Sequence, residues 1–504
     1  MPSRGAPNSA ARTPGPGLRH TLTLRDLVVY GLLFIAPMAP VGVFGALDAA
    51  SGGAVALVYV VATFAMAFTA VSYVRMVRAV PLAGSVYSYA RAGLGPGAGF
   101  VAGWMALLDY LLIPAVGYLF SGVAMHQLVP AVDQWIWTAA AVVVTTALNL
   151  SGVRRAAIAG FVVLAVELLA LAVFVGAALV VLAEQGPARG WLSPLTGDRG
   201  FSAVAVLSAV SVAVLSFLGF DAIANFAEET VRSGRTGQRR TADRGAPSLV
   251  GRALLGCLLL AGVLFVVQTY LAGLLSPGSS ARLAKEPAAQ ASAFYTVAQS
   301  AAGSWLQLTI AASKALGAAF AALAGQAASG RLLYAMARDR RLPAGLSKVD
   351  GASGVPRRTL LLSAVLTLGA AVWAARSPAG LDRLVSVVDI GALTAFALLH
   401  LSVMGYYGLG RRGAGSAGGV AAGAGTAAEA GARRSLAADW LLPLVGLGIT
   451  VAVIVTARRE AHLVGLAWLL VALIVLAVRR VRGVRDPGAP GADSAAGRSV
   501  GGGG

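Results

Sequence analysis

Uncharged windows long enough to cross a bilayer recur along the whole chain, and they limit what it can fold into. One of them runs for twenty residues from Phe201 to Phe220 without a Lys, Arg, Asp or Glu. A membrane-spanning helix needs about 18 or more mainly apolar residues. Only 12% of the 504 residues are charged and the mean hydropathy is +0.76, whereas soluble domains carry about 25% charged residues. We therefore predict an all-α integral membrane protein.

The windows predict helices and not barrel strands. A bilayer admits only helices and closed barrels, because every backbone polar group must be bonded internally. The alternating ten-residue segments of a membrane barrel do not occur in this sequence. We predict twelve membrane helices, near residues 27–47, 54–74, 98–124, 135–152, 157–183, 201–229, 253–275, 303–334, 359–375, 384–409, 440–457 and 461–478.

The positive charges predict the orientation of these helices. Cytoplasmic loops of membrane proteins carry an excess of Lys and Arg. If the N-terminus is cytoplasmic, the cytoplasmic segments hold 31 of the 40 Lys and Arg residues, the outer loops hold 8, and Lys314 lies within a span. This asymmetry predicts a multi-pass protein of the plasma membrane with both termini in the cytoplasm.

Composition also limits the partners and cofactors. The net charge of +19 would suggest nucleic acid in a soluble protein. In a membrane protein, these Lys and Arg residues are explained by their role in orienting the helices and by contacts with lipid head groups. The bilayer is therefore the expected partner, and nucleic acid is not. The single cysteine, Cys257, excludes internal disulfides and thiolate metal sites, and we predict no cofactor.

Two spans contain helix breakers at matching positions. The first reads YGLLFIAPMAPVGVFGAL, in which Pro37 and Pro40 remove amide donors. In the sixth, Gly219 stands between Phe217 and Asp221. A proline alone can mean only a kink, but paired interruptions in two halves of a chain indicate an inverted-repeat transporter. Unwound backbone is tolerated in a bilayer only where it faces a cavity or a substrate.

Asp221 is a carboxylate inside an apolar span. An ionised side chain at mid-bilayer costs roughly 2.5–3.5 kcal/mol on insertion scales, so it is rarely kept without a partner. Beside a helix break, the cationic group of a ligand would replace the water that this carboxylate has lost. Asp221 is therefore a candidate for binding an ammonium group.

Three stretches resemble the amino acid–polyamine–organocation (APC) superfamily of permeases. SFLGFDAIANFAEE resembles its sixth helix, residues 76–104 its second-to-third-helix linker, and residues 325–343 the end of its eighth helix. The resemblance runs from about residue 21 to 405. It implies a LeuT-like 5+5 inverted repeat with helices 1 and 6 discontinuous and helices 11 and 12 as accessories.

The resemblance also divides the chain into segments. Residues 1–24 and 481–504 are expected to be disordered cytoplasmic tails, and 410–438 a low-complexity cytoplasmic loop. The first repeat would cover residues 25–183, the second repeat 201–409, and the accessory helices 439–480.

The resemblance implies roles for particular residues of the two breaks. Many amino-acid permeases have G-S-G-I-F in the first break, whose amides bind a substrate carboxylate, and the aligned stretch here runs from Pro40 through Gly42 and Val43 to Phe44. Pro40 lacks an N–H, and the stretch is more similar to the putrescine-importer branch, whose substrate has no carboxylate.

In the sixth helix, the resemblance implies that carbonyls around Phe217 and Gly219 bind the substrate ammonium. Asp221 stands where related arginine and putrescine exchangers have an acid. Phe320 aligns with an aromatic residue beneath the substrate, where a cation–π contact would contribute about 0.5–2 kcal/mol.

Other buried charges have open alternatives. Glu167, deep in the fifth span, falls where sodium-independent relatives carry a lysine; it could exchange a proton, form a fixed pair with Lys314, or bind a cation. Asp109 in the third span could bind an ammonium group or neutralise Lys314. Asp389 is expected at the start of the tenth span as a helix-start or gate residue, and His400 is expected to be hydrogen-bonded within the bundle.

These features predict a secondary active permease that imports amino acids by proton symport through alternating access. A polyamine (putrescine) importer or an amine exchanger is the alternative, and a non-transporting membrane sensor is the alternative from another class. An enzyme is not expected, because neither HExxH nor a nucleotide-binding GxxxxGK[ST] occurs. The expected partners are a small amine-bearing solute, protons and lipid, and the protein would be a monomer or a homodimer.

Overall fold

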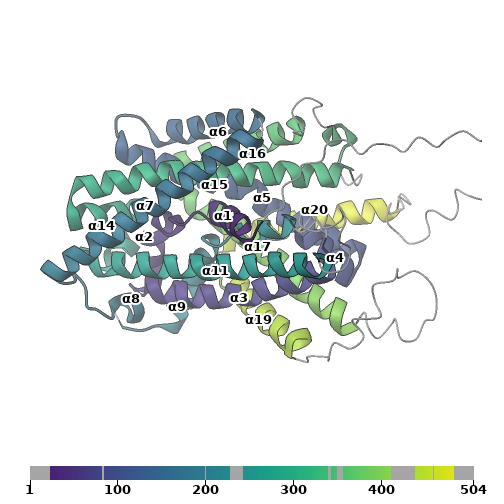
Figure 1. Ribbon diagram of the computed structural model, residues 1–504, viewed down its shortest axis with the longest axis horizontal. Coiled ribbons are helices and arrows are strands. Elements are labelled where there is room, and N and C mark those ends of the chain that lie inside the picture. Colours follow the sequence, from purple (N-terminus) through teal and green to yellow (C-terminus); the bar gives the residue numbers. More distant parts are fainter. Residues whose placement is uncertain are drawn as a thin grey trace, which may run out of the picture.

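The computed structural model is a bundle of long helices (Figure 1). It describes residues 23–81, 85–151, 153–198, 200–226, 242–338, 342–348, 356–377, 379–409, 437–457 and 459–481, and these include no strand. Nearly all of the predicted 1–24 and 481–504 tails and of the predicted 410–438 loop lie outside these residues. The chain is therefore an all-helical membrane protein, as the uncharged windows predict.

Nine helices in the described part of the chain are long and apolar enough to cross a membrane, and a bent pair makes a tenth. Predicted spans four and six correspond to shorter apolar helices, α6 (Gln134–Leu150) and α9 (Ala203–Leu215). The nine are α3 (Val55–Ala79), α5 (Pro96–Leu128), α7 (Val153–Gln185), α11 (Ala242–Leu275), α15 (Ser304–Arg338), α16 (Arg357–Arg376), α17 (Gly380–Val403), α19 (Leu442–Thr456) and α20 (Arg459–Val481).

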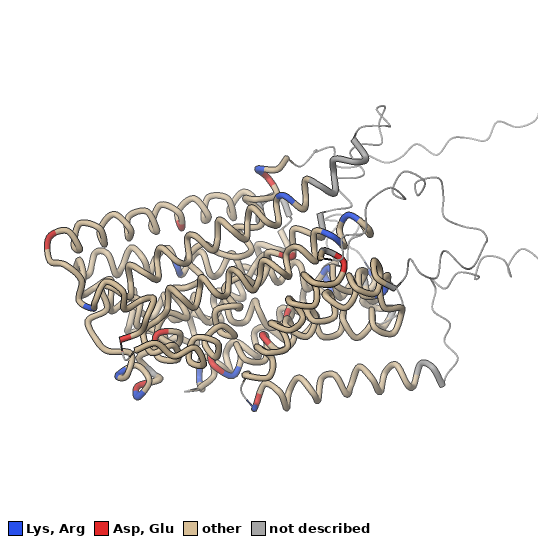
Figure 2. Tube along the Cα trace, turned by 90° about the horizontal axis from the view of Figure 1, so that it is seen from below, with Lys and Arg blue, Asp and Glu red and all other residues tan. Residues whose placement is uncertain are grey.

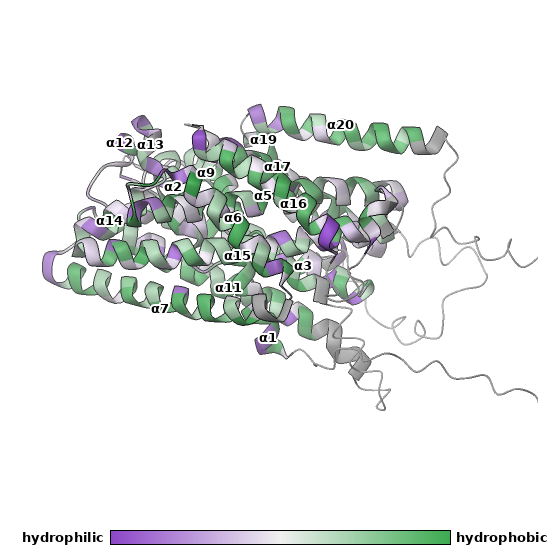
Figure 3. Ribbon diagram, turned by 90° about the horizontal axis from the view of Figure 1, so that it is seen from above, coloured by the Kyte–Doolittle hydropathy of each residue, from purple (hydrophilic) through white to green (hydrophobic). Residues whose placement is uncertain are grey.

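Polar and apolar residues are distributed as lipid requires. Figure 2 shows Lys and Arg mostly near helix ends, with long uncharged stretches between them. Figure 3 shows apolar residues along the outward sides of α7 and α20. Large apolar side chains such as Phe64, which is 66% exposed, therefore face lipid and not water.

The first span is broken, but earlier than the aligned Pro40–Phe44 stretch. α1 (Leu24–Ile35) and α2 (Ala39–Ser51) are bent by 48°, and Ala36 between them has a positive φ of 59°. Pro40 instead lies in the first turn of α2, where its missing N–H would have no helical partner in any case. The unwound residues are thus 36–38, and Pro37 is the proline at the break.

The sixth span is interrupted where Gly219 predicts it. α9 ends at Leu215, a turn follows, and a 3-10 helix, η1, runs over Phe220–Phe226. Gly219 has a φ of +103°, and a Cβ there would lie 3.1 Å from the Phe34 carbonyl oxygen. Gly219 therefore permits both the turn and the close approach of the two breaks.

Short helices complete the described structure. Two of the remaining elements are π-helical, and they precede and follow residues 410–436. The remaining elements are α4 (Ser85–Leu94), α8 (Ser193–Thr196), α12 (Ser280–Lys285), α13 (Pro287–Gln290), α14 (Ala293–Ala302), η3 (Ala344–Ser347), η4 (Met404–Leu409) and η5 (Ala437–Leu441).

Candidate substrate-binding site

A cavity of about 90 Å³ lies where the two helix breaks meet α5 and α15. Most of its lining is apolar, and its three ionisable residues with ordinarily charged side chains are Asp109, Asp221 and Lys314. A small apolar cavity with a few polar groups is the usual form of a small-molecule site. This cavity is therefore the candidate binding site.

Four of the eight predicted substrate-binding residues line this cavity. The other four are also described by the structure but are not in the lining. Val43, Asp109, Gly219 and Asp221 are in its lining. The other four are Pro40, Gly42, Phe217 and Phe320.

Packing explains why two of these residues lie outside the lining. A Cβ at Gly42 would stand 2.7 Å from the Phe120 ring, so Gly42 is the contact between α2 and α5. Phe217 belongs to an aromatic cluster, with its ring centroid 5.0 Å from that of Phe265 and 6.3 Å from that of Tyr59.

Aromatic residues that the sequence does not single out line the cavity instead. They are Phe34, Tyr110 and Phe120. Phe120 and Tyr110 belong to α5, the helix that also carries Asp109. Only the packing of α5 against the breaks identifies them as residues of the cavity lining. Phe120 lies 5.2 Å below the Lys314 ammonium, a distance that gives a cation–π contact.

Asp221 is buried and already bonded by the protein. Its Oδ2 accepts hydrogen bonds from the hydroxyl groups of Tyr73 at 3.2 Å and Tyr110 at 3.0 Å. The side chain is 6% exposed. Asp221 thus ties α3 and α5 to the second break, and these donors replace much of its lost water.

Asp109 is buried in the same cavity without such donors. The residue is 9% exposed, and its Oδ1 has no hydrogen-bond partner among the described residues. Asp221 and Asp389, two buried acids, interact with it electrostatically as like charges. A buried carboxylate without partners is strongly unfavourable, and a ligand cation would remove that cost. Asp109 is the cavity acid whose bonding is incomplete.

Side chains of the second half bind the carbonyls freed at the first break. Lys314 on α15 donates to the Met38 carbonyl at 3.0 Å. Gln268 on α11 donates to the Pro37 carbonyl at 2.9 Å. Both residues are buried, Lys314 at 2% exposure and Gln268 at 0%. The Gln268 bond satisfies a carbonyl that the bend leaves without a helical partner, whereas the Lys314 bond adds a second donor to the Met38 carbonyl, which also accepts from the Val41 amide. The sequence signal for both bonds is a polar residue within an apolar span.

Glu167 on α7 is buried beside α15. It is 1% exposed, its Oε1 lacks a hydrogen-bond partner among the described residues, and its carboxylate rests on Gly317. Lys314 acts on it electrostatically. However, no ion pair within 4.0 Å joins these two described side chains, so a direct fixed pair is not formed.

Two further expectations have clear outcomes. Asp389 is the tenth residue of α17 and is 4% exposed, so the prediction of a helix-start residue near the interface is wrong. A charge-free window misses the first turn of a helix when that turn contains charged residues. This is the case for α17, which begins at Gly380. The prediction for His400 is confirmed, since its Nδ1 lies 2.9 Å from the Ser72 hydroxyl.

Comparison with known proteins agrees with this geometry. Residues 27–412 match the model of the amino acid permease family. The chain therefore belongs to this family of membrane transporters, which is part of the APC superfamily, and it is not an enzyme.

Its relatives include importers of two kinds of solute. The chain is 30% identical over 407 residues to the low-affinity putrescine importer PlaP of Escherichia coli (strain K12), covering 79% of this chain and 84% of that protein. It is also 30% identical over 417 residues to the branched-chain amino acid permease BcaP of Lactococcus lactis subsp. cremoris (strain MG1363), covering 78% and 82%.

Proposed function

We propose that this permease imports small cationic amines by alternating access and that Asp109 binds the ammonium group of the solute. The observation that carries the proposal is the buried Oδ1 of Asp109 in the cavity between the two breaks, which has no hydrogen-bond partner among the described residues. An N⁺–H···O⁻ hydrogen bond to this oxygen would satisfy both charges. The name of the relative PlaP, a putrescine importer, agrees with such a solute.

The start of α2 favours a solute without a carboxylate. The amides of Ala39 and Val41 already donate to the carbonyls of Ala36 at 2.8 Å and Met38 at 3.1 Å. Pro40 has no amide hydrogen. Two of the backbone amides near the break are therefore used and a third is missing, which supports a solute without a carboxylate, such as putrescine.

Amino acids are the second candidate, and Lys314 favours them. Its ammonium lines the cavity and would attract a carboxylate, although it would first have to weaken its bond to Met38. Branched-chain amino acids are the solutes that the name of the relative BcaP gives. The mainly apolar lining fits an aliphatic side chain equally well.

Proton symport is proposed as the driving force, with Glu167 as the proton-binding residue. Its burial, its unpartnered oxygen and its electrostatic contact with Lys314 support this role. Protonation would change the charge beside Lys314, and Lys314 binds the first break directly. A proton on Glu167 would in this way alter the helix that moves during transport.

The membrane arrangement is part of the same proposal. We propose twelve spans in a 5+5 inverted repeat, with both termini in the cytoplasm of the cell and the protein in its plasma membrane. The breaks in the first and sixth predicted spans support the repeat. The distribution of Lys and Arg supports the orientation.

Uptake into proteoliposomes tests the proposal. Labelled putrescine, leucine and lysine would be supplied with and without an imposed inward proton gradient. We expect gradient-dependent putrescine uptake that Asp109→Asn abolishes. Preference for leucine would select the amino-acid candidate, and the absence of uptake of every amine and amino acid would overturn the proposal.

A further inference from the structure

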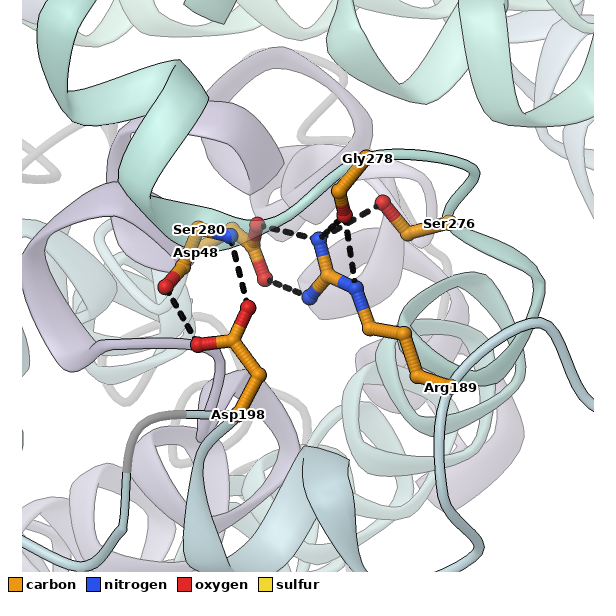
Figure 4. A network of polar contacts seen from close by, with 6 residues as sticks. All are labelled: Asp48, Arg189, Asp198, Ser276, Gly278 and Ser280. Atoms are coloured by element: carbon orange, nitrogen blue, oxygen red, sulfur yellow. Dashed lines mark hydrogen bonds and ion pairs between the residues drawn. The ribbon is translucent and has the colours of Figure 1, made fainter.

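A buried ion pair joins α2 to the connection that follows α7, at the end of the bundle that carries α8 (Figures 1 and 4). Arg189 Nη1 donates to Asp48 Oδ1 at 2.7 Å, and Nη2 donates to Oδ2 at 3.0 Å. The Asp48 side chain is 0% exposed and that of Arg189 is 7% exposed. Removing either partner would leave the other charge buried and unpaired, which is strongly unfavourable.

The same guanidinium binds a third segment, the connection between α11 and α12. Its Nε donates to the Gly278 carbonyl at 2.9 Å and its Nη2 to the Ser276 hydroxyl at 2.8 Å. The Arg189 amide also donates to the Leu274 carbonyl at 3.1 Å. One side chain therefore holds three segments that are far apart in the sequence.

Asp198 joins the same part of the molecule a second time (Figure 4). Its carboxylate accepts from the Ser280 amide at 2.7 Å and from the Ser280 hydroxyl at 2.5 Å. Its own amide donates to the Gly52 carbonyl, just after α2, at 2.9 Å. Together, the bonds of Arg189 and Asp198 close this end of the bundle around the end of α2.

Helix α2 connects this network to the candidate site. Asp48 lies ten residues beyond Met38 at the first break, about 15 Å away at 1.5 Å per residue. Because α2 is a continuous helix, displacement of its far end also displaces the break. Separation of α2 from Arg189 would therefore release the break from this end of the bundle.

The network is suited to reversible opening because water can reach it. A surface cavity of about 570 Å³ is lined by Arg189, Asp198, Ser276 and Gly278, among others. The Arg189 guanidinium, which lines this cavity, would be hydrated once it is released from Asp48, whereas a charge separated in a sealed core would not be.

We propose that Arg189 is a positioning residue of the transport cycle, whose bonds to Asp48, Ser276 and Gly278 hold this end closed and break when the cavity opens toward it. The proposal rests on alternating access, as given under the proposed function. It assigns Arg189 a role in closing the pathway and none in binding the solute.

Thiol accessibility tests this role without any solute. In a Cys257→Ala background, Ala318→Cys places a reporter in the cavity lining. Proteoliposomes would be treated with a membrane-impermeant thiol reagent from each side in turn. We expect Asp48→Asn and Arg189→Gln to raise the modification rate from the α8 side about tenfold, because the lost pair shifts the conformational equilibrium toward the open state.

A matched control is the exposed pair Arg282–Glu286 on α12, at 3.5 Å and with side chains 71% and 51% exposed. Arg282→Gln should leave the rate unchanged. Ser276→Ala, which removes one hydrogen bond and no charge, should raise it about two- to threefold.

Wild-type modification rates in all folded network variants would overturn the proposal. If the two charge variants do not fold, the Ser276→Ala variant still tests the proposal. A higher rate of thiol modification supports the proposal, and a wild-type rate contradicts it. A failure of amine uptake would not change this result, because the reporter reacts in the absence of solute.

Discussion

Asp221 and Asp109 line one cavity, but their surroundings give them different tasks. Asp221 lies at a helix break, and two tyrosine hydroxyl groups from neighbouring helices bond to it. Asp109 lies within the continuous helix α5, whose amides are used in the helix and leave its side chain without backbone donors. A break in a helix can thus satisfy a buried carboxylate, whereas an intact helix leaves it available to a ligand.

The comparison changes the expected role of Asp221. The sequence alone favours it as the residue that binds the ammonium group, because it is the acid beside a predicted break. In the structure it links the second break to Tyr73 on α3 and Tyr110 on α5. We therefore expect Asp221 chiefly to position the cavity wall and Asp109 chiefly to bind the solute.

The largest expected effect is that of Asp109→Asn on transport. Loss of one partner of a buried, hydrogen-bonded charge pair costs about 2–5 kcal/mol, so kcat/KM for putrescine should fall about 100-fold. Initial rates of labelled uptake measure this change. Asp133→Asn, at an exposed position before α6, is the control and should transport normally. A variant of Asp109 with unimpaired uptake would remove the residue from the site.

A smaller effect is expected from Glu167→Gln. The variant cannot carry a proton on this side chain, so accumulation of solute under an imposed pH gradient should fall more than about tenfold, which corresponds to about 1.4 kcal/mol of lost coupling. Binding of putrescine should change less than about twofold, because Glu167 does not line the cavity. Normal gradient-driven accumulation by this variant would refute the coupling role.

Asp221→Asn should affect stability more than solute binding. The change weakens hydrogen bonds to a buried carboxylate, which contribute about 1.5–3 kcal/mol each, so the midpoint of thermal unfolding in detergent should fall clearly. KM should rise less than about fivefold. Tyr110→Phe, which removes one of the donors, should give a smaller decrease in the unfolding midpoint. If KM rose strongly while the unfolding midpoint stayed constant, Asp221 would bind the solute directly.

The smallest expected effect on transport compares two aromatic residues, one inside the cavity lining and one outside it. Phe120 lines the cavity and lies below Lys314, whereas Phe320 is on α15 outside the lining. Because a cation–π contact contributes about 0.5–2 kcal/mol, Phe120→Leu should lower kcat/KM about three- to tenfold. Phe320→Leu should lower it less than about twofold, and the reverse order of the two variants would support the role that the resemblance implies for Phe320.

The sequence predicts the class of fold well, because lipid imposes one strong rule on every span. Charge-free windows identify the membrane helices, and Gly219 marks the second break at the correct residue. The resemblance implies a first break at Pro40–Phe44, but a proline disrupts the turn before it and is accepted in the first turn of the next helix. Pro37 therefore follows the end of α1, and Pro40 lies in the first turn of α2.

The details of the site depend on contacts that no local pattern contains. Tyr73 and Tyr110 reach Asp221 from two other helices, over sequence separations of 148 and 111 residues. Gln268 and Lys314 reach the first break from the opposite half of the chain. Sequence patterns predict which groups need partners, but only the packing of the spans shows which groups supply them.

The affinity of the purified protein for putrescine tests the central claim most directly. Calorimetry on the wild type, Asp109→Asn and Asp221→Asn, at one pH and one salt concentration, separates binding from the steps of transport. The two cavity acids predict that Kd rises at least about 30-fold in the Asp109 variant and less than about fivefold in the Asp221 variant. A larger rise for Asp221→Asn than for Asp109→Asn would contradict the assignment of Asp109 as the residue that binds the ammonium group.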